Sequence, residues 1–144
     1  MRILFTKSKW EMWDDPLEDF LRRAASDGFD AVEIYLPAQP ESPAEIAARV
    51  ADHGLQLVAQ INTEGATLAE HLATLEKRFA AAIETVPVLI NSNTGRDIFP
   101  FEDNLAIFRR ACELSQRSGI VFTAETHRSR PTDDGPGPRS LDAA

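Results

Sequence analysis

The sequence has a single cysteine, Cys112, and no apolar run that approaches the roughly 18 residues of a membrane span. Its N-terminus also lacks the apolar region of a signal peptide. One cysteine cannot form a disulfide within the chain, and these absences together lead us to expect a cytoplasmic protein. Because Cys112 falls on the apolar side of a predicted helix, we expect it to serve in packing.

Positive charge is scarce as well. The chain has 15 Lys and Arg residues against 23 Asp and Glu residues, which gives a net charge of −8. Proteins bind nucleic acids and anionic membranes through clustered Lys and Arg, so this balance argues against both as partners. It leaves room for a local basic patch.

The rest of the composition is that of one ordinary globular domain, with 43% hydrophobic and 26% charged residues in 144. Short apolar segments alternate with segments of helical periodicity, in units of roughly 30 residues, the size of a βαβ step. This alternation predicts an α/β fold with a parallel sheet. The predicted strands are 2–6, 29–36, 55–62, 86–91 and a fifth that begins at Ile120.

The predicted helices carry recognisable start and stop signals. The first begins after the segment 14–16, which offers two N-cap acids and a proline, and it stops at Gly28. Capping boxes open the next two helices, at Ser42–Glu45 and Thr67–Glu70. The fourth helix runs from about Phe101 to Gly119, and its apolar stripe includes Leu105, Phe108 and Cys112.

Four predicted strands carry a polar side chain on the same face, near their carboxyl ends: Glu33, Gln60, Asn91 and Glu125. An open doubly wound sheet has helices on both faces, whereas a (β/α)₈ barrel keeps its helices outside a lumen that opens at those strand ends. The polar face therefore favours barrel winding. A complete barrel takes ~250 residues, so this chain supplies a partial TIM barrel of about four and a half βα units.

The segment 120–130, I-V-F-T-A-E-T-H-R-S-R, passes from a buried strand to concentrated charge within a few residues. Charged residues are seldom buried without a partner, so this strand is expected to end in a functional mouth. Arginine offers a planar fork to phosphate or carboxylate, and the candidates are Arg96, Arg128 and Arg130. His127 is either a substrate contact or an ordinary loop residue.

Three motifs at consecutive strand ends resemble those of the xylose isomerase-like TIM barrels: G-F-D-A-V-E at 28–33, I-N-S-N-T-G-R-D at 90–97 and E-T-H-R at 125–128. That superfamily contains sugar phosphate isomerases and epimerases and is related to AP endonuclease family 2. The resemblance covers residues 1–130 and implies an incomplete barrel domain of that type, with a sugar or sugar phosphate as the small-molecule partner.

The resemblance also implies roles for residues. Glu125 matches a glutamate that is both the first ligand of a divalent metal, Mg²⁺ or Mn²⁺, and half of an acid/base pair. The other ligands of the family lie on strands six to eight, which this sequence does not supply, and Asn93 stands where relatives often carry a histidine ligand. The metal is thus expected in the full-length family, and this chain alone is expected to lack most of its site. The substrate-binding candidates are Glu33, Asn91, Arg96, His127 and Arg128.

Several other residues receive simpler interpretations. Trp10 and Trp13 either cover a sugar face or pack under the first helix, and we favour packing. Four residues are expected to be solvent-exposed without a further role: Lys7, Lys9, His53 and His71.

The last segment, 131–144, has three prolines, two glycines and one large apolar residue, so we expect a disordered tail. Three hypotheses follow. The first is a metal-dependent sugar isomerase or epimerase-like protein, truncated and inactive alone. The second is a non-catalytic half-barrel that self-associates as a homodimer to cover its exposed strand edges. The third is a complete small doubly wound enzyme, which requires helices on both faces of its sheet.

Overall fold

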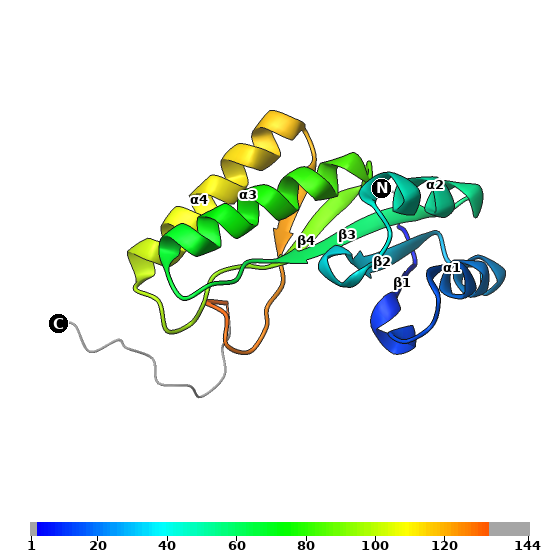
Figure 1. Ribbon diagram of the computed structural model, residues 1–144, viewed down its shortest axis with the longest axis horizontal. Coiled ribbons are helices and arrows are strands. Elements are labelled where there is room, and N and C mark those ends of the chain that lie inside the picture. Colours follow the sequence, from blue (N-terminus) through cyan, green and yellow to red (C-terminus); the bar gives the residue numbers. More distant parts are fainter. Residues whose placement is uncertain (1–2, 133–144) are drawn as a thin grey trace.

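The computed structural model describes residues 3–132 and shows one parallel sheet with the strand order β1-β2-β3-β4-β5 (Figure 1). Residues 133–144, which hold most of the predicted tail, lie outside the described part. The strands are β1 (Thr6–Ser8), β2 (Ala31–Tyr35), β3 (Gln56–Asn62), β4 (Leu89–Asn93) and β5 (Val121–Ala124). The helices are α1 (Leu17–Ser26), α2 (Pro43–Asp52), α3 (Leu68–Glu84) and α4 (Phe101–Ser118), with short 3₁₀ turns at Lys9–Met12 and Leu36–Ala38.

The helices follow one side of the sheet in a single layer. Each parallel pair is formed by strands consecutive in the sequence, and right-handed crossovers then place every connecting helix on the same side. Consecutive helices accordingly pack on one another, and Figure 1 shows α3 beside α4 along β3 and β4. The doubly wound alternative is therefore wrong, and barrel-type winding is confirmed.

Strand alternation separates an apolar face from a polar one. Under the helices lie fully buried residues such as Ile34 of β2, Ile61 of β3 and Ile90 of β4. Fully buried side chains of the helices, including Phe20 and Phe79, complete two apolar clusters between sheet and helices. The opposite face of the same strands carries the polar side chains, so the core and the functional face occupy opposite sides of one sheet.

Two strands, β1 and β4, begin later than their apolar residues predict. The hydrogen-bond ladder between β1 and β2 starts only at Phe5, whose carbonyl oxygen accepts from the N–H groups of Asp30 and Ala31 at 2.9 and 3.2 Å. Ile3 and Phe5 precede β1 and are 66% and 67% exposed, because β1 is an edge strand and no described element covers it. Val86, predicted to open the fourth strand, is instead 81% exposed in the turn before β4.

The helix starts agree with the sequence at two places and differ at a third. Both bonds of each capping box are present, at Ser42–Glu45 and Thr67–Glu70. At α1, by contrast, Pro16 itself is the N-cap and no side chain caps the helix. The preceding turn is held by Lys9 Nζ, which donates to three backbone oxygens, at Met12, Trp13 and Asp15, over 2.9 to 3.2 Å. Lys9 is only 5% exposed, so the expectation that it solvates a loop is wrong.

The buried face of α4 is rotated from the predicted stripe. It consists of Asn104, Ile107 and Ala111, and Cys112 is exposed, so the packing role expected for that cysteine is wrong. Helix α4 packs against α3 and β5, and no other described helix makes comparable contact with it. Among residues 3–132 no helix is both long and apolar enough to cross a lipid bilayer.

Candidate functional site

Three predicted site residues, Glu33, Asn91 and Glu125, meet on the polar face of the sheet. Asn91 Nδ2 donates to Glu33 Oε1 at 2.9 Å and to Glu125 Oε2 at 3.3 Å. The side chain of Gln60 donates to the same Glu125 oxygen at 3.0 Å. The ladder explains the convergence: Gln60 pairs with Asn91 across β3 and β4, and Glu125 continues the β4–β5 ladder through a bond from its N–H to Ser92 O at 3.0 Å.

The bonds leave one oxygen of each carboxylate available. An ionised carboxylate only accepts hydrogen bonds, and amide NH₂ groups are matching donors. Glu125 Oε1 and Glu33 Oε2 accept no hydrogen bond from the described residues, and neither is a buried unpaired atom. The site therefore holds two oriented carboxylates whose remaining oxygens can meet a substrate.

Asn93 adds an unpaired acceptor at the end of β4. Its Oδ1 is buried and has no hydrogen-bond partner among the described residues. Asn93 has the same strand parity as Asn91, so it belongs to the polar face. A buried acceptor without a donor costs about 1–3 kcal/mol.

An aromatic wall of Trp10, Trp13 and Tyr35 stands beside the carboxylates. The ring centroids of the two tryptophans are 4.6 Å apart, and each stacks on Tyr35 at 5.9 and 6.2 Å. Trp10 Nε1 donates to Gln60 Oε1 at 2.7 Å, which connects the wall to the amide that holds Glu125. The tryptophans are 53% and 43% exposed, so the interpretation that they pack under the first helix is wrong.

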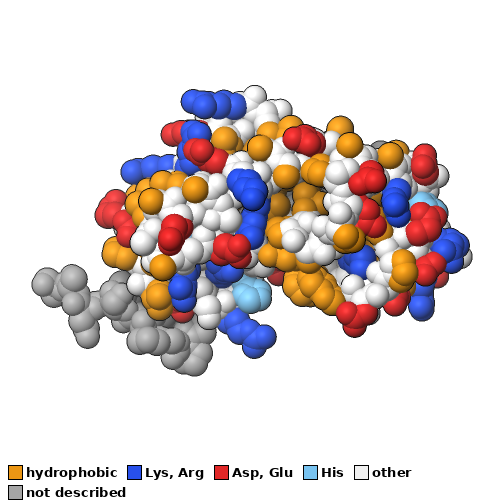
Figure 2. All heavy atoms as spheres, in the orientation of Figure 1, with side chains coloured by type: hydrophobic (Ala, Val, Ile, Leu, Met, Phe, Trp, Pro, Cys, Tyr) orange, Lys and Arg blue, Asp and Glu red, His pale blue; other side chains and the backbone are white. Residues whose placement is uncertain are grey.

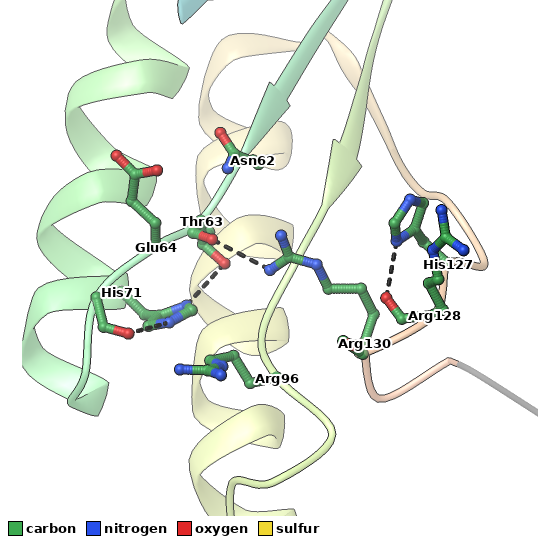
Figure 3. Close-up of a pocket in the computed structure, with 10 residues that line it drawn as sticks. Asn62, Thr63, Glu64, His71, Arg96, His127, Arg128 and Arg130 are labelled. Atoms are coloured by element: carbon green, nitrogen blue, oxygen red, sulfur yellow. Dashed lines mark hydrogen bonds between the residues drawn. The ribbon is translucent and has the colours of Figure 1, made fainter. Parts of the chain in front are cut away.

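Arg96, His127 and Arg128 lie elsewhere, around a cavity of about 420 Å³ between the loops that follow β3, β4 and β5. The sequence grouped them with the carboxylates as one substrate-binding set. In the structure Glu33, Asn91 and Glu125 are joined by hydrogen bonds, whereas these three residues line the cavity. Figure 3 shows side chains from these loops and from the start of α3 around the cavity. Its lining includes Asn62, Thr63, Glu64, His71, Arg96, His127, Arg128 and Arg130.

The floor of this cavity is a hydrogen-bonded chain through His71. Gly95 N–H donates to Thr63 Oγ1 at 2.8 Å, Thr63 Oγ1 lies 2.9 Å from His71 Nδ1, and His71 Nε2 lies 3.2 Å from Gly65 O. The carbonyl can only accept, so the consistent assignment is a neutral imidazole protonated at Nε2. Burial lowers the pKa of His71, in keeping with that form. His71 is fully buried, so the expectation of a surface residue is wrong.

His53, the other histidine expected to be exposed, is half-buried at the end of α2. Its Nε2 lies 2.9 Å from Glu18 Oε1 of α1. This pair joins the two helices and lies outside both the carboxylate site and the cavity.

Arg130 extends from the loop after β5 into the cavity. Its Nη1 donates to Thr63 O at 3.2 Å and to Gly95 O at 2.7 Å. Burial and the nearby charge of Arg96 lower the pKa of the Arg130 guanidinium. A neighbouring residue, Tyr35, has its pKa raised by burial, and its hydroxyl donates to Asn62 Oδ1 at 2.7 Å. Asn62 thereby links the aromatic wall to the cavity.

The described residues supply only part of a metal-ligand set. No group of three or more His, Cys, Asp or Glu side chains within residues 3–132 is arranged to hold a metal ion. Glu33 and Glu125 provide two carboxylates, and the amide that lies between them presents its NH₂ group rather than its oxygen. These two side chains would fill only part of the coordination sphere of a hard divalent ion, and water or substrate oxygens would have to supply the rest.

Sequence reasoning missed Tyr35, Asn62, Thr63 and His71 as site residues. The available signal was the strand parity of Tyr35 and Asn62, which have the same parity as Glu33 and Gln60 in their strands. Thr63 and His71 gave no comparable signal, because their roles depend on how two loops approach each other.

No family model and no curated protein sequence matches the chain. Among solved structures, it resembles the D-psicose 3-epimerase of Clostridium cellulolyticum H10 crystallised with D-tagatose, with a TM-score of 0.70 and 16% identity over 86% of this chain and 52% of that one. A D-psicose 3-epimerase in the presence of D-fructose gives a TM-score of 0.68 and 16% identity over 89% and 54%. The chain thus spans about half the length of these enzymes. The likeness establishes the fold, and the predicted partial TIM barrel is confirmed.

Proposed function

We propose that this chain contributes to a sugar or sugar phosphate isomerase or epimerase, in which Glu125 transfers a proton. The observation that carries the proposal is the pair of carboxylates, Glu33 and Glu125, joined by one amide of Asn91 next to an aromatic wall. The likeness in fold to two epimerase structures that involve ketohexoses supports the choice of substrate class.

The chemistry requires removal of a proton from the carbon next to a carbonyl group and its return after the enediolate forms. Glu125 Oε2 is held by Gln60 and Asn91, so Oε1 is the oxygen that takes the proton. Glu33 Oε2 accepts a hydroxyl of the sugar. The stacked tryptophans offer a flat apolar surface to the sugar ring or chain.

The family resemblance implies a divalent metal ion, and Glu125 would be one of its ligands. Such an ion stabilises an enediolate as a Lewis acid. The donors within residues 3–132 do not complete the coordination of such an ion. The proposed proton transfer therefore relies on the side chains alone.

Deuterium exchange tests the proposal directly. The protein is incubated in D₂O with D-fructose or D-tagatose, with and without Mn²⁺, and incorporation next to the carbonyl is followed by NMR. The sequence predicts that the chain alone is inactive, but the proposed proton transfer needs only side chains that are present here. We therefore expect exchange by the natural chain and by the control Glu84→Gln, an exposed carboxylate at the end of α3. Glu125→Gln should slow exchange by about a hundredfold or more. Equal rates for both variants would refute the role of Glu125.

A second candidate is the non-catalytic, self-associating half-barrel. It is favoured by the apolar side chains at the two outer strands, Ile3 and Phe5 at 66% and 67% exposure before β1 and Val121 at 57% in β5. Sedimentation of the natural chain and of Val121→Lys tests it, because an edge lysine opposes strand pairing. A dimer that Val121→Lys dissociates, together with no deuterium exchange, supports this candidate; a monomer at all concentrations contradicts it.

A further inference from the structure

We propose that the cavity between the loops after β3, β4 and β5 is an oxyanion site that binds a phosphate group. Three arginines line it, Arg96, Arg128 and Arg130, and the carboxylate that also lines it, Glu64, is already paired with Arg78 outside the lining. In a chain with a net charge of −8 this is a local concentration of positive charge. Figure 2 shows Lys and Arg side chains beside a histidine at the lower edge of this face.

None of the three guanidinium groups forms an ion pair with a described carboxylate. No described carboxylate lies within 4.0 Å of a guanidinium nitrogen of Arg96, Arg128 or Arg130, although five other arginines of residues 3–132 form ion pairs. Arg130 uses Nη1 on two carbonyl oxygens, which leaves Nε and Nη2 as donors. The charge of Arg96 makes that of Arg130 less favourable, whereas the carboxylates of Asp97 and Glu64 favour it from beyond ion-pair distance. A bound anion would offset the repulsion between the two arginines.

The loops that carry the arginines are fixed before any ligand binds. Asn104 of α4 accepts from the Arg96 N–H at 3.1 Å and donates to Arg96 O at 2.8 Å, so the backbone of Arg96 is held at both groups. The chain from Gly95 through Thr63 to His71 ties the β4 loop to the β3 loop. Arg130 then joins the loop after β5 to both of them. Such preorganisation reduces the entropy lost on binding.

Phosphate suits this arrangement because it offers several oxygens to planar guanidinium forks. The cavity, at about 420 Å³, has room for more than one phosphate group, and Asn62 of its lining is bonded to Tyr35 of the aromatic wall. We therefore assign the phosphate to a phosphorylated sugar whose carbon chain extends toward Glu125, an assignment that rests on the proposed function. The position differs from the common phosphate site of TIM barrels, which lies after strands seven and eight.

Titration of the full chain with inorganic phosphate at constant ionic strength tests the site. The double variant Arg96→Gln/Arg128→Gln removes two lining cations whose side chains make no hydrogen bond to described residues. The control is Arg109→Gln, an exposed arginine of α4 without an ion pair among described residues. We expect phosphate binding by the natural chain and the control, and at least a tenfold weaker affinity for the double variant.

Two results would overturn the site: no phosphate binding by the natural chain, or equal weakening by Arg109→Gln and the double variant, which would indicate net charge alone. Comparing D-fructose 6-phosphate with D-fructose and inorganic phosphate then identifies the ligand, and the hexose phosphate should bind most tightly. The two proposals fail separately. Phosphate binding without deuterium exchange would refute only the proposed function, whereas exchange on D-fructose without phosphate binding would refute only this site.

Discussion

The buried imidazole of His71 makes the stability of this protein sensitive to mild acid. Its Nδ1 is bonded to Thr63 and its Nε2 to Gly65, so the neutral form satisfies both nitrogens. Burial is the main cause that lowers the pKa of His71 below its ordinary value of 6.5, and the charges of Arg130 and Arg96 lower it further, while bonding to Gly65 and the charge of Glu70 oppose them. Protonation would place a hydrogen on Nδ1, which could then no longer accept the hydrogen bond that the Thr63 hydroxyl donates.

The sign of the effect follows from proton linkage. Above pH 6.5 His71 is neutral in both the folded and the unfolded chain, and its contribution to stability is fully present. Below that pH the unfolded chain takes up a proton while the folded chain does not, until the lowered folded pKa is reached. The free energy of unfolding therefore falls as the pH drops through this window, by up to about 1.4 kcal/mol per pH unit.

Urea unfolding of the natural chain and of His71→Gln, from pH 7.5 to 5, measures this loss. Glutamine can accept from Thr63 and donate to Gly65, but it does not titrate. At neutral pH the variant should therefore be about 1–3 kcal/mol less stable than the natural chain. Below pH 6.5 its free energy of unfolding should fall much less than that of the natural chain. His53→Gln, at the pair with Glu18, is the control and should keep the His71-dependent decline. An identical decline in the natural chain and His71→Gln would refute the reasoning.

Two further predictions concern the loops and a cap. Gly95 and Gly119 have φ of +73° and +72°, but a Cβ at Gly95 would clash with the Asn104 side chain while one at Gly119 meets nothing within 4 Å. Alanine should cost about 1 kcal/mol at Gly119 and clearly more at Gly95, as measured by urea unfolding; equal costs would contradict the clash. Ser42→Ala removes one side of the capping box with Glu45 and should lower the free energy of unfolding by about 1 kcal/mol. A thermal scan measures this loss. An unchanged melting temperature would show that the cap contributes nothing.

The carboxylate site is the part that the sequence predicted best. Glu33, Asn91 and Glu125 were placed on one face because side chains alternate along a strand, and parallel neighbours bring their carboxyl ends to one edge. These rules depend on only a few consecutive residues, so they can be applied to a sequence whose tertiary packing is not known. The position of the aromatic wall beside this site was harder to predict, because the path of the turn after β1 depends on the hydrogen bonds of buried Lys9.

The cavity could not be predicted as a separate feature. Arg96, His127 and Arg128 were expected to bind substrate, and the loops after β4 and β5 place them around a cavity that the β3 loop also lines. Their position depends on contacts between residues distant in the sequence, such as the bonds from Arg130 to Thr63 and Gly95. A loop has no periodicity that records such contacts.

The amino-acid sequence by itself determined the kind and order of the strands and helices, two of the helix caps and the polar face of the sheet, since each depends on local periodicity and side-chain chemistry. Tertiary structure alone decided which face of α4 is covered, that His71 is buried while Cys112 is exposed, and that the arginines line a cavity of their own. The physical reason is that burial depends on which elements approach each other, and a sequence pattern shows an apolar stripe without showing what covers it.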